Sequence, residues 1–161
     1  MDFIKNYFTA EKSESLIFMT IGLLTISFSV YAWAKWGDSF YKGFALPVVF
    51  VGIIQLVVGG TVYFRTDQQI IELTNLYSKS KSDFVKSETP RMETVMKNFS
   101  LYKKIEVAFV VIGLLLIFIG RSREFWLGVG VGMLLQGALM LTADIFAERR
   151  GKEYLFQISK E

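Results

Sequence analysis

Long uncharged hydrophobic stretches alternate with short charged segments along this chain. Four stretches contain no Asp, Glu, Lys or Arg: residues 16–34, 43–64, 107–120 and 125–143. An apolar run of about 20 residues crosses the hydrocarbon core of a bilayer as a helix, which satisfies its own backbone hydrogen bonds in lipid. The pattern predicts an all-α integral membrane protein, a four-helix bundle of two hairpins with spans at about residues 16–34, 43–64, 105–120 and 125–146.

Basic residues are distributed unequally between the two sides of this bundle. Of the 18 Lys and Arg residues, 14 lie in the N-terminal segment, in residues 65–104 and in the tail 147–161. The positive-inside rule then places both termini in the cytoplasm, and we expect a bacterial inner membrane. The opposite ends of the helices carry an expected aromatic belt: Trp33, Trp36, Phe40, Tyr41, Phe125 and Trp126.

The segments predicted to lie in the cytoplasm also have helical patterns. Phe3, Ile4, Tyr7 and Phe8 share one helical face, which predicts a short amphipathic helix lying on the inner membrane surface; an unstructured terminus is the alternative.

Residues 65–104 predict a cytoplasmic helical hairpin. An apolar stripe ends near Tyr77, the polar run SKSKSD follows, and Thr89 with Pro90 has the form of a new helix start. A second stripe begins at Met92. Such stripes must be buried, either against each other or against a partner.

The two halves of the chain resemble each other weakly. IGLLTI at 21–26 is similar to IGLLLI at 112–117, and each half then has a Gln followed six residues later by a Thr. An internal duplication of a two-helix unit and chance similarity between apolar helices both explain this.

Gln55 and Gln136 lie near the midplane of their predicted spans, where an amide facing lipid would cost several kcal/mol. Two interpretations follow: the amides bond the helices together, to each other or to hydroxyls, or they line a path. Small or polar residues share helix faces that fit either interpretation: Thr25, Ser29, Gly52, Gly59, Gly128 and Gly132.

A group of charged residues lies at the inner ends of the predicted spans: Arg65, Glu106, Asp144, Glu148 and Arg149. Interfacial ion pairing is the simpler interpretation, and a metal or proton site is the other. We expect no resident metal or cofactor.

The composition argues against several function classes. With no Cys and no His, the chain has no disulfide, thiolate nucleophile or histidine base, and no catalytic motif replaces them. The net charge of +3 does not indicate nucleic-acid binding, because carboxylates are interspersed with the basic residues. We therefore expect a non-enzymatic protein acting through protein–protein contacts, as an accessory subunit, an immunity protein, or a defence or signalling component. Its expected partners are the lipid bilayer and either another copy or another membrane protein. The alternative is a small oligomeric channel or transporter with Gln55 and Gln136 lining the path.

Overall fold

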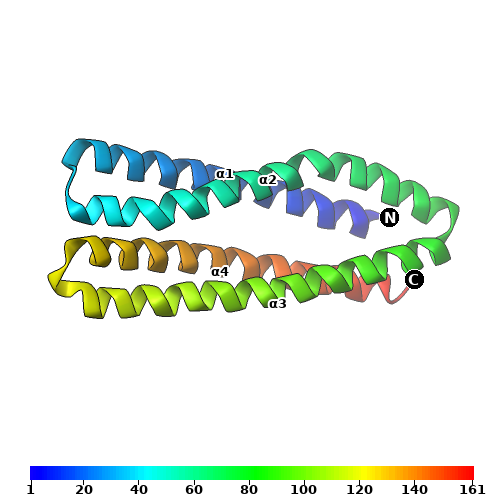
Figure 1. Ribbon diagram of the computed structural model, residues 1–161. Coiled ribbons are helices and arrows are strands. Elements are labelled where there is room, and N and C mark those ends of the chain that lie inside the picture. The colour runs from blue at the N-terminus through cyan, green and yellow to red at the C-terminus, as the bar shows by residue number, and fades with distance from the viewer.

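Four long helices make up nearly all of the computed structural model, which describes residues 1–161 (Figure 1). In chain order they are α1 (Asp2–Trp36), α2 (Ser39–Lys79), α3 (Lys81–Ile119) and α4 (Glu124–Ile158), with a short 3-10 turn, η1 (Gly120–Ser122), before α4. There are no strands. Each of the four helices is long and apolar enough to cross a membrane, which confirms the predicted all-helical class and fits a multi-pass membrane protein.

Tight connections reverse the chain between the helices. Gly37 ends α1 with a φ of 65°, in the left-handed region that glycine adopts without steric cost, and its N–H donates to the Trp33 carbonyl at 2.9 Å. Ser80 alone separates α2 from α3, and its hydroxyl caps α3 by accepting the Asp83 N–H at 3.2 Å. We call the end with both termini and Ser80 the terminal end, and the end with Gly37 and η1 the loop end (Figure 1).

The four helices are not packed equally. α1 packs on α2, α3 packs on α4, and α2 contacts α4 along the middle of the bundle (Figure 1). The two central helices run in the same direction and approach closely near the loop end: a Cβ placed on Gly128 would lie 2.0 Å from the Phe40 carbonyl oxygen. Large apolar side chains cover the outside of this part, among them Phe50 and Phe118 at 61% and 71% exposure, as lipid contact requires.

The terminal end has a hydrophobic core like that of a water-soluble protein, and all four helices contribute to it. Its buried members come from α1, α3 and α4: Ile4, Phe8, Phe84, Met92, Tyr154 and Ile158. Side chains of α2, including Ile70, Leu73, Leu76 and Tyr77, pack against them. The expected cytoplasmic hairpin of residues 65–104 is therefore part of a four-helix cluster, because the two terminal segments fill the space beside its stripes.

Two sequence expectations for this region are wrong, and the fourth helix is longer than its predicted span. Residues 2–8 form no separate surface helix; they are the first turns of α1, and Ile4 and Phe8 are fully buried in the cluster. α3 starts at Lys81 rather than at Thr89, and Pro90 lies inside it. The expected tail 147–161 continues α4 as far as Ile158, because Tyr154 and Ile158 belong to the same core.

Candidate functional site

A buried polar layer joins three helices in the middle of the apolar part. Gln55 of α2 and Gln136 of α4 are 1% and 0% exposed. The Gln55 amide nitrogen donates to the Gln136 Oε1 at 3.3 Å, and the Gln136 amide nitrogen donates to the Thr25 hydroxyl of α1 at 3.2 Å. The Thr25 hydroxyl in turn donates to the Gly22 carbonyl at 3.1 Å. The expected contact between the two glutamines is thus present, within one copy of the chain.

Glycines make the space for this layer. A Cβ on Gly22 would lie 3.0 Å from the Gln55 Cβ and 3.1 Å from its Oε1, so only a glycine of α1 lets Gln55 sit there without a shift. Gly52 and Gly59 face α1, where they approach Ile26 and Met19.

The other small residues predicted for this site lie outside the glutamine layer. Gly128 and Gly132 face α2, at Phe40, Phe44 and Pro47. Ser29 is fully buried, but its hydroxyl donates to the Ile26 carbonyl of its own helix and does not join the glutamine layer.

The predicted charge cluster does not form one site. Glu148 pairs with Lys103 of α3 and with Lys152, whose Nζ lies 2.9 Å from the Glu148 Oε1. Arg65 approaches Glu11 at 3.6 Å, and Arg149 is exposed and makes no ion pair.

Glu106 and Asp144 remain apart from these pairs. Glu106 is 4% exposed, and neither of its carboxylate oxygens accepts a hydrogen bond from a donor group. Asp144 of α4 and Lys103 are the ionisable groups beside it.

A second polar network, which the sequence analysis missed, lies in the core of the terminal end. Glu88 is 1% exposed and accepts two hydrogen bonds from the Arg91 guanidinium, at 2.6 and 2.7 Å. It also accepts the Tyr154 hydroxyl of α4 at 3.0 Å. The signal for it was a carboxylate in an apolar stripe, since Phe84, Glu88 and Met92 follow each other at helical steps of four.

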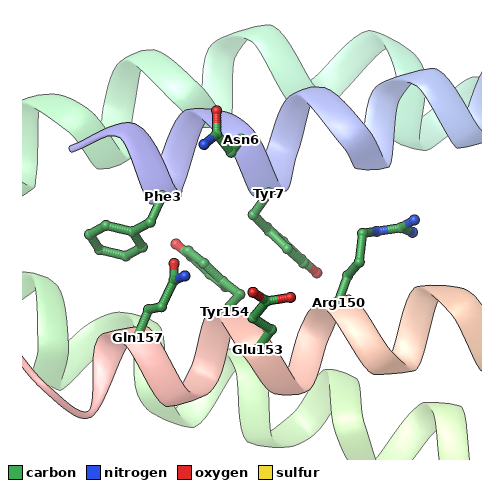
Figure 2. Close-up of a pocket in the computed structure, with 7 residues that line it drawn as sticks. All are labelled: Phe3, Asn6, Tyr7, Arg150, Glu153, Tyr154 and Gln157. Carbon is green, nitrogen blue, oxygen red and sulfur yellow. The ribbon is translucent and has the colours of Figure 1, made fainter.

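A cavity of about 260 Å³ lies beside this network, between the first turns of α1 and the last turns of α4 (Figure 2). Tyr7 and Tyr154, which both line it, stack directly on each other with ring centroids 4.2 Å apart. Burial raises the pKa of both phenols, so they stay protonated and can act only as hydroxyl donors and acceptors. The lining residues are Phe3, Asn6, Tyr7, Arg150, Glu153, Tyr154 and Gln157.

This cavity contains no arrangement of a nucleophile and a base. Arg150, its one basic lining residue, forms an ion pair with Glu14 of α1. The pair links α4 to α1 at the place where the two helices frame the cavity, which indicates a packing role.

No protein-family model, curated protein or solved structure matches the chain. The class of protein therefore follows from the fold: an all-helical protein with four helices that are able to cross a membrane.

Proposed function

We propose that the protein is a non-enzymatic multi-pass membrane protein that acts through protein–protein contacts at its terminal end, as an accessory, immunity or signalling component. The observation that carries this proposal is that the side chains of both mid-helix glutamines make hydrogen bonds inside one four-helix bundle. Their amides bond each other and Thr25, so they hold α1, α2 and α4 together rather than facing a path.

The terminal end supports the same proposal. There the four helices extend beyond their uncharged stretches and pack around a core of Phe, Met, Tyr and Ile side chains. The α2 extension from Arg65 to Lys79 alone spans about 22 Å at 1.5 Å per residue. A rigid body of this size with a charged surface is suited to contact another protein in water.

We place the terminal end in the cytoplasm, because 14 of the 18 basic residues lie on that side. Since the chain has no cysteine, single cysteines report this topology without background. In whole cells, Ser122→Cys at the loop end should react with an impermeant maleimide, whereas Ser82→Cys beside Ser80 should react only after lysis. The reverse pattern would invert the orientation.

We also infer that the two hairpins are repeats of one unit. In the first, Gly22 and Ile26 pack on Gly52; in the second, Gly113 and Ile117 pack on Gly130. Seven residues away along each helix the contacts correspond again: Ser15 with Gly59, and Glu106 with Gly137.

The glycine contacts align the two hairpins differently from an alignment that matches Gln55 with Gln136. Gln55 lies three residues after Gly52, whereas Gln136 lies six residues after Gly130. The two glutamines are therefore not equivalent positions of the repeat. Alanine at Gly52 and at Gly130 should destabilise the protein to a similar degree, because each added Cβ meets atoms of the facing helix closer than 3 Å; tolerance of one but not the other argues against the repeat.

Reconstitution separates the proposed function from a channel. Wild-type protein in liposomes should give no more ion flux than empty liposomes, and Gln55→Leu with Gln136→Leu should lower thermal stability without changing flux. Flux by the wild type that this double variant abolishes while it remains assembled would replace the proposal with the channel function.

The protein contact itself can be mapped by photo-crosslinking in native membranes. A photoreactive amino acid at Glu93, exposed on α3 in the terminal end, should give protein-sized adducts. At Phe118, 71% exposed in the apolar part, it should react with lipid only. Lipid or water adducts at both positions would contradict a protein partner at the terminal end.

A further inference from the structure

Glu106 lies in the contact between α3 and α4, at the end of the predicted third span that is nearer the terminal end. Its backbone carbonyl lies 3.2 Å from the position of a Cβ on Gly137, so the two helices are close together here. The side chain is 4% exposed, and both carboxylate oxygens are buried without a hydrogen-bond donor.

The surrounding charges do not compensate this carboxylate. Asp144 of α4 adds a second negative group, and Lys103 of α3 is bonded to Glu148. Asp144 itself has only Glu106, Lys103 and Glu148 as ionisable neighbours, and α1 and α2 bring no charge to either group. A buried ionised carboxylate without a partner is strongly unfavourable, and two adjacent carboxylates resist ionising together.

Packing does not require a carboxyl group at this position. In the first hairpin the corresponding place beside Gly59 is taken by Ser15, which is 7% exposed. The Ser15 hydroxyl satisfies itself by donating to the Lys12 carbonyl at 2.7 Å. In the second hairpin Glu106 stands in place of this serine. Its side chain is longer, and it has no hydrogen-bond partner on its own helix.

We propose that Glu106 and Asp144 form a proton-binding acid pair between α3 and α4, in which Glu106 holds a proton at neutral pH and Asp144 accepts its hydrogen bond. The ligand is a proton, which converts the Glu106 carboxylate into a neutral carboxylic acid and supplies the missing donor. Loss of this proton leaves two negative charges side by side in the helix contact, so the α3–α4 packing at this end depends on pH.

A membrane-permeant carbodiimide tests the protonated state in the full-length protein in nanodiscs. The Glu106 O–H adds across one C=N bond of the reagent, and the adduct rearranges to a stable N-acylurea with no leaving group, which mass spectrometry locates on one peptide. We expect labelling of Glu106 at neutral pH that decreases as the pH is raised. Glu106→Gln should remove the label, and the control Glu93→Gln, at an exposed carboxylate of the same helix that has no contact with the pair, should keep it.

Asp144→Asn gives a readout that a purely structural role would not change. Removal of the neighbouring negative charge makes ionisation of Glu106 easier, so the loss of labelling should move to lower pH. Infrared spectroscopy supplies a measurement that does not depend on reagent access: wild type, but not Glu106→Gln, should show a protonated-carboxyl band at neutral pH.

Two results would overturn the proposal. Absence of both the label and the infrared band at neutral pH would show that Glu106 is ionised. Suppression of labelling by sodium at constant pH and ionic strength, with choline as the control, would show that the pair holds a metal cation instead of a proton.

Discussion

Glu88 is the residue on which the polar interactions of the terminal end converge. It is buried, and it accepts two hydrogen bonds from Arg91 and one from Tyr154, so it links α3 to α4. Glu88→Ala would leave the guanidinium and the phenol without their acceptor. We expect a loss of about 2–3 kcal/mol in stability, below the range for a fully buried pair because Arg91 is 32% exposed. Thermal unfolding in detergent measures this, with the exposed Glu93→Ala as control; equal melting temperatures would contradict it.

Glu11 is a buried carboxylate whose replacement should stabilise the protein, in contrast to Glu88, and the effect should depend on pH. Burial raises the pKa of its carboxyl above the ordinary value, although Arg65 lowers it, and its Oε2 is buried without a partner. The folded state therefore binds the proton more tightly than the unfolded state, and stability falls as the pH rises from the ordinary glutamate pKa through the raised value. Charged Glu11 thus opposes folding at neutral pH.

Glu11→Gln should accordingly raise the melting temperature at neutral pH. The difference from wild type should disappear at pH values below the ordinary glutamate pKa, where both side chains are neutral. Melting curves at the two pH values measure this, with the exposed Glu93→Gln as control. A lower melting temperature for Glu11→Gln at neutral pH would mean that the pair with Arg65 outweighs the cost of burial.

At the level of single residues, the sequence was informative where the pattern within one helix was enough to predict a side chain's surroundings. The central place of Gln55 and Gln136 in uncharged stretches indicated that the amides need partners inside the protein. Glu88 also had a local signal, a carboxylate in an apolar stripe with Arg91 three residues on, but its bond to Tyr154 could not be predicted, because Tyr154 lies far along the chain in a segment expected to be a tail. For the same reason the sequence placed Glu106 among ion pairs, whereas Lys103 bonds Glu148 instead.

At the scale of elements, the close contact of α2 and α4 depends on glycine. A Cβ on Gly128 would lie 2.0 Å from the Phe40 carbonyl oxygen and 2.9 Å from the Phe44 nitrogen, both of them backbone atoms that cannot rotate away. Gly128→Ala should therefore force the helices apart and cost about 1–3 kcal/mol, the usual range for overpacking.

Gly60→Ala is the matched control for this prediction. It lies on α2, the helix that Gly128 of α4 contacts, but a Cβ there meets no atom within 4 Å. Alanine is the better helix former by up to about 1 kcal/mol, so this variant should be neutral or slightly more stable. Equal unfolding curves for the Gly128 and Gly60 variants would contradict the close α2–α4 contact.

The spans were easier to predict than the ends of the helices. Apolar stretches of about 20 residues identify membrane helices from local composition alone. α1, α2 and α4 each contain an uncharged one, and the shorter uncharged stretch 107–120 marks the span that begins in α3. The helix extensions depend on tertiary packing: the aromatic face of residues 3–8 fits a membrane surface and a protein core equally well. Pro90 gives the same lesson, because a proline that often starts a helix lies here inside α3, whose start Ser80 caps.

At the scale of the whole molecule, the terminal end and the apolar part are held by different forces. The first buries Phe8 and its neighbours in a hydrophobic core, whereas the second has an apolar outer surface suited to lipid and relies on close backbone contact and buried amides. Phe8→Ala should therefore cost about 3–5 kcal/mol in the terminal end alone.

Hydrogen exchange in nanodiscs measures this difference by region. Protection should fall around Phe84 and Tyr154, which share the Phe8 cluster, and should stay unchanged around Gln55. Phe156→Ala, at a side chain that is 60% exposed, serves as control and should leave both regions protected. Loss of protection throughout the chain would show that the two parts unfold as one unit.

The core that joins Ile4 to Ile158 also determines the order of events during biosynthesis. Ile4 and Phe8 are synthesised before the other helices, whereas Tyr154 and Ile158 are added only after α2 and α3 have been made. The aromatic face of the first turns of α1 therefore remains without its final packing partners while α2, α3 and α4 are translated and inserted into the membrane. Closure of this core consequently follows the synthesis of all four helices, and until then the nascent chain exposes the apolar aromatic face of the first turns of α1.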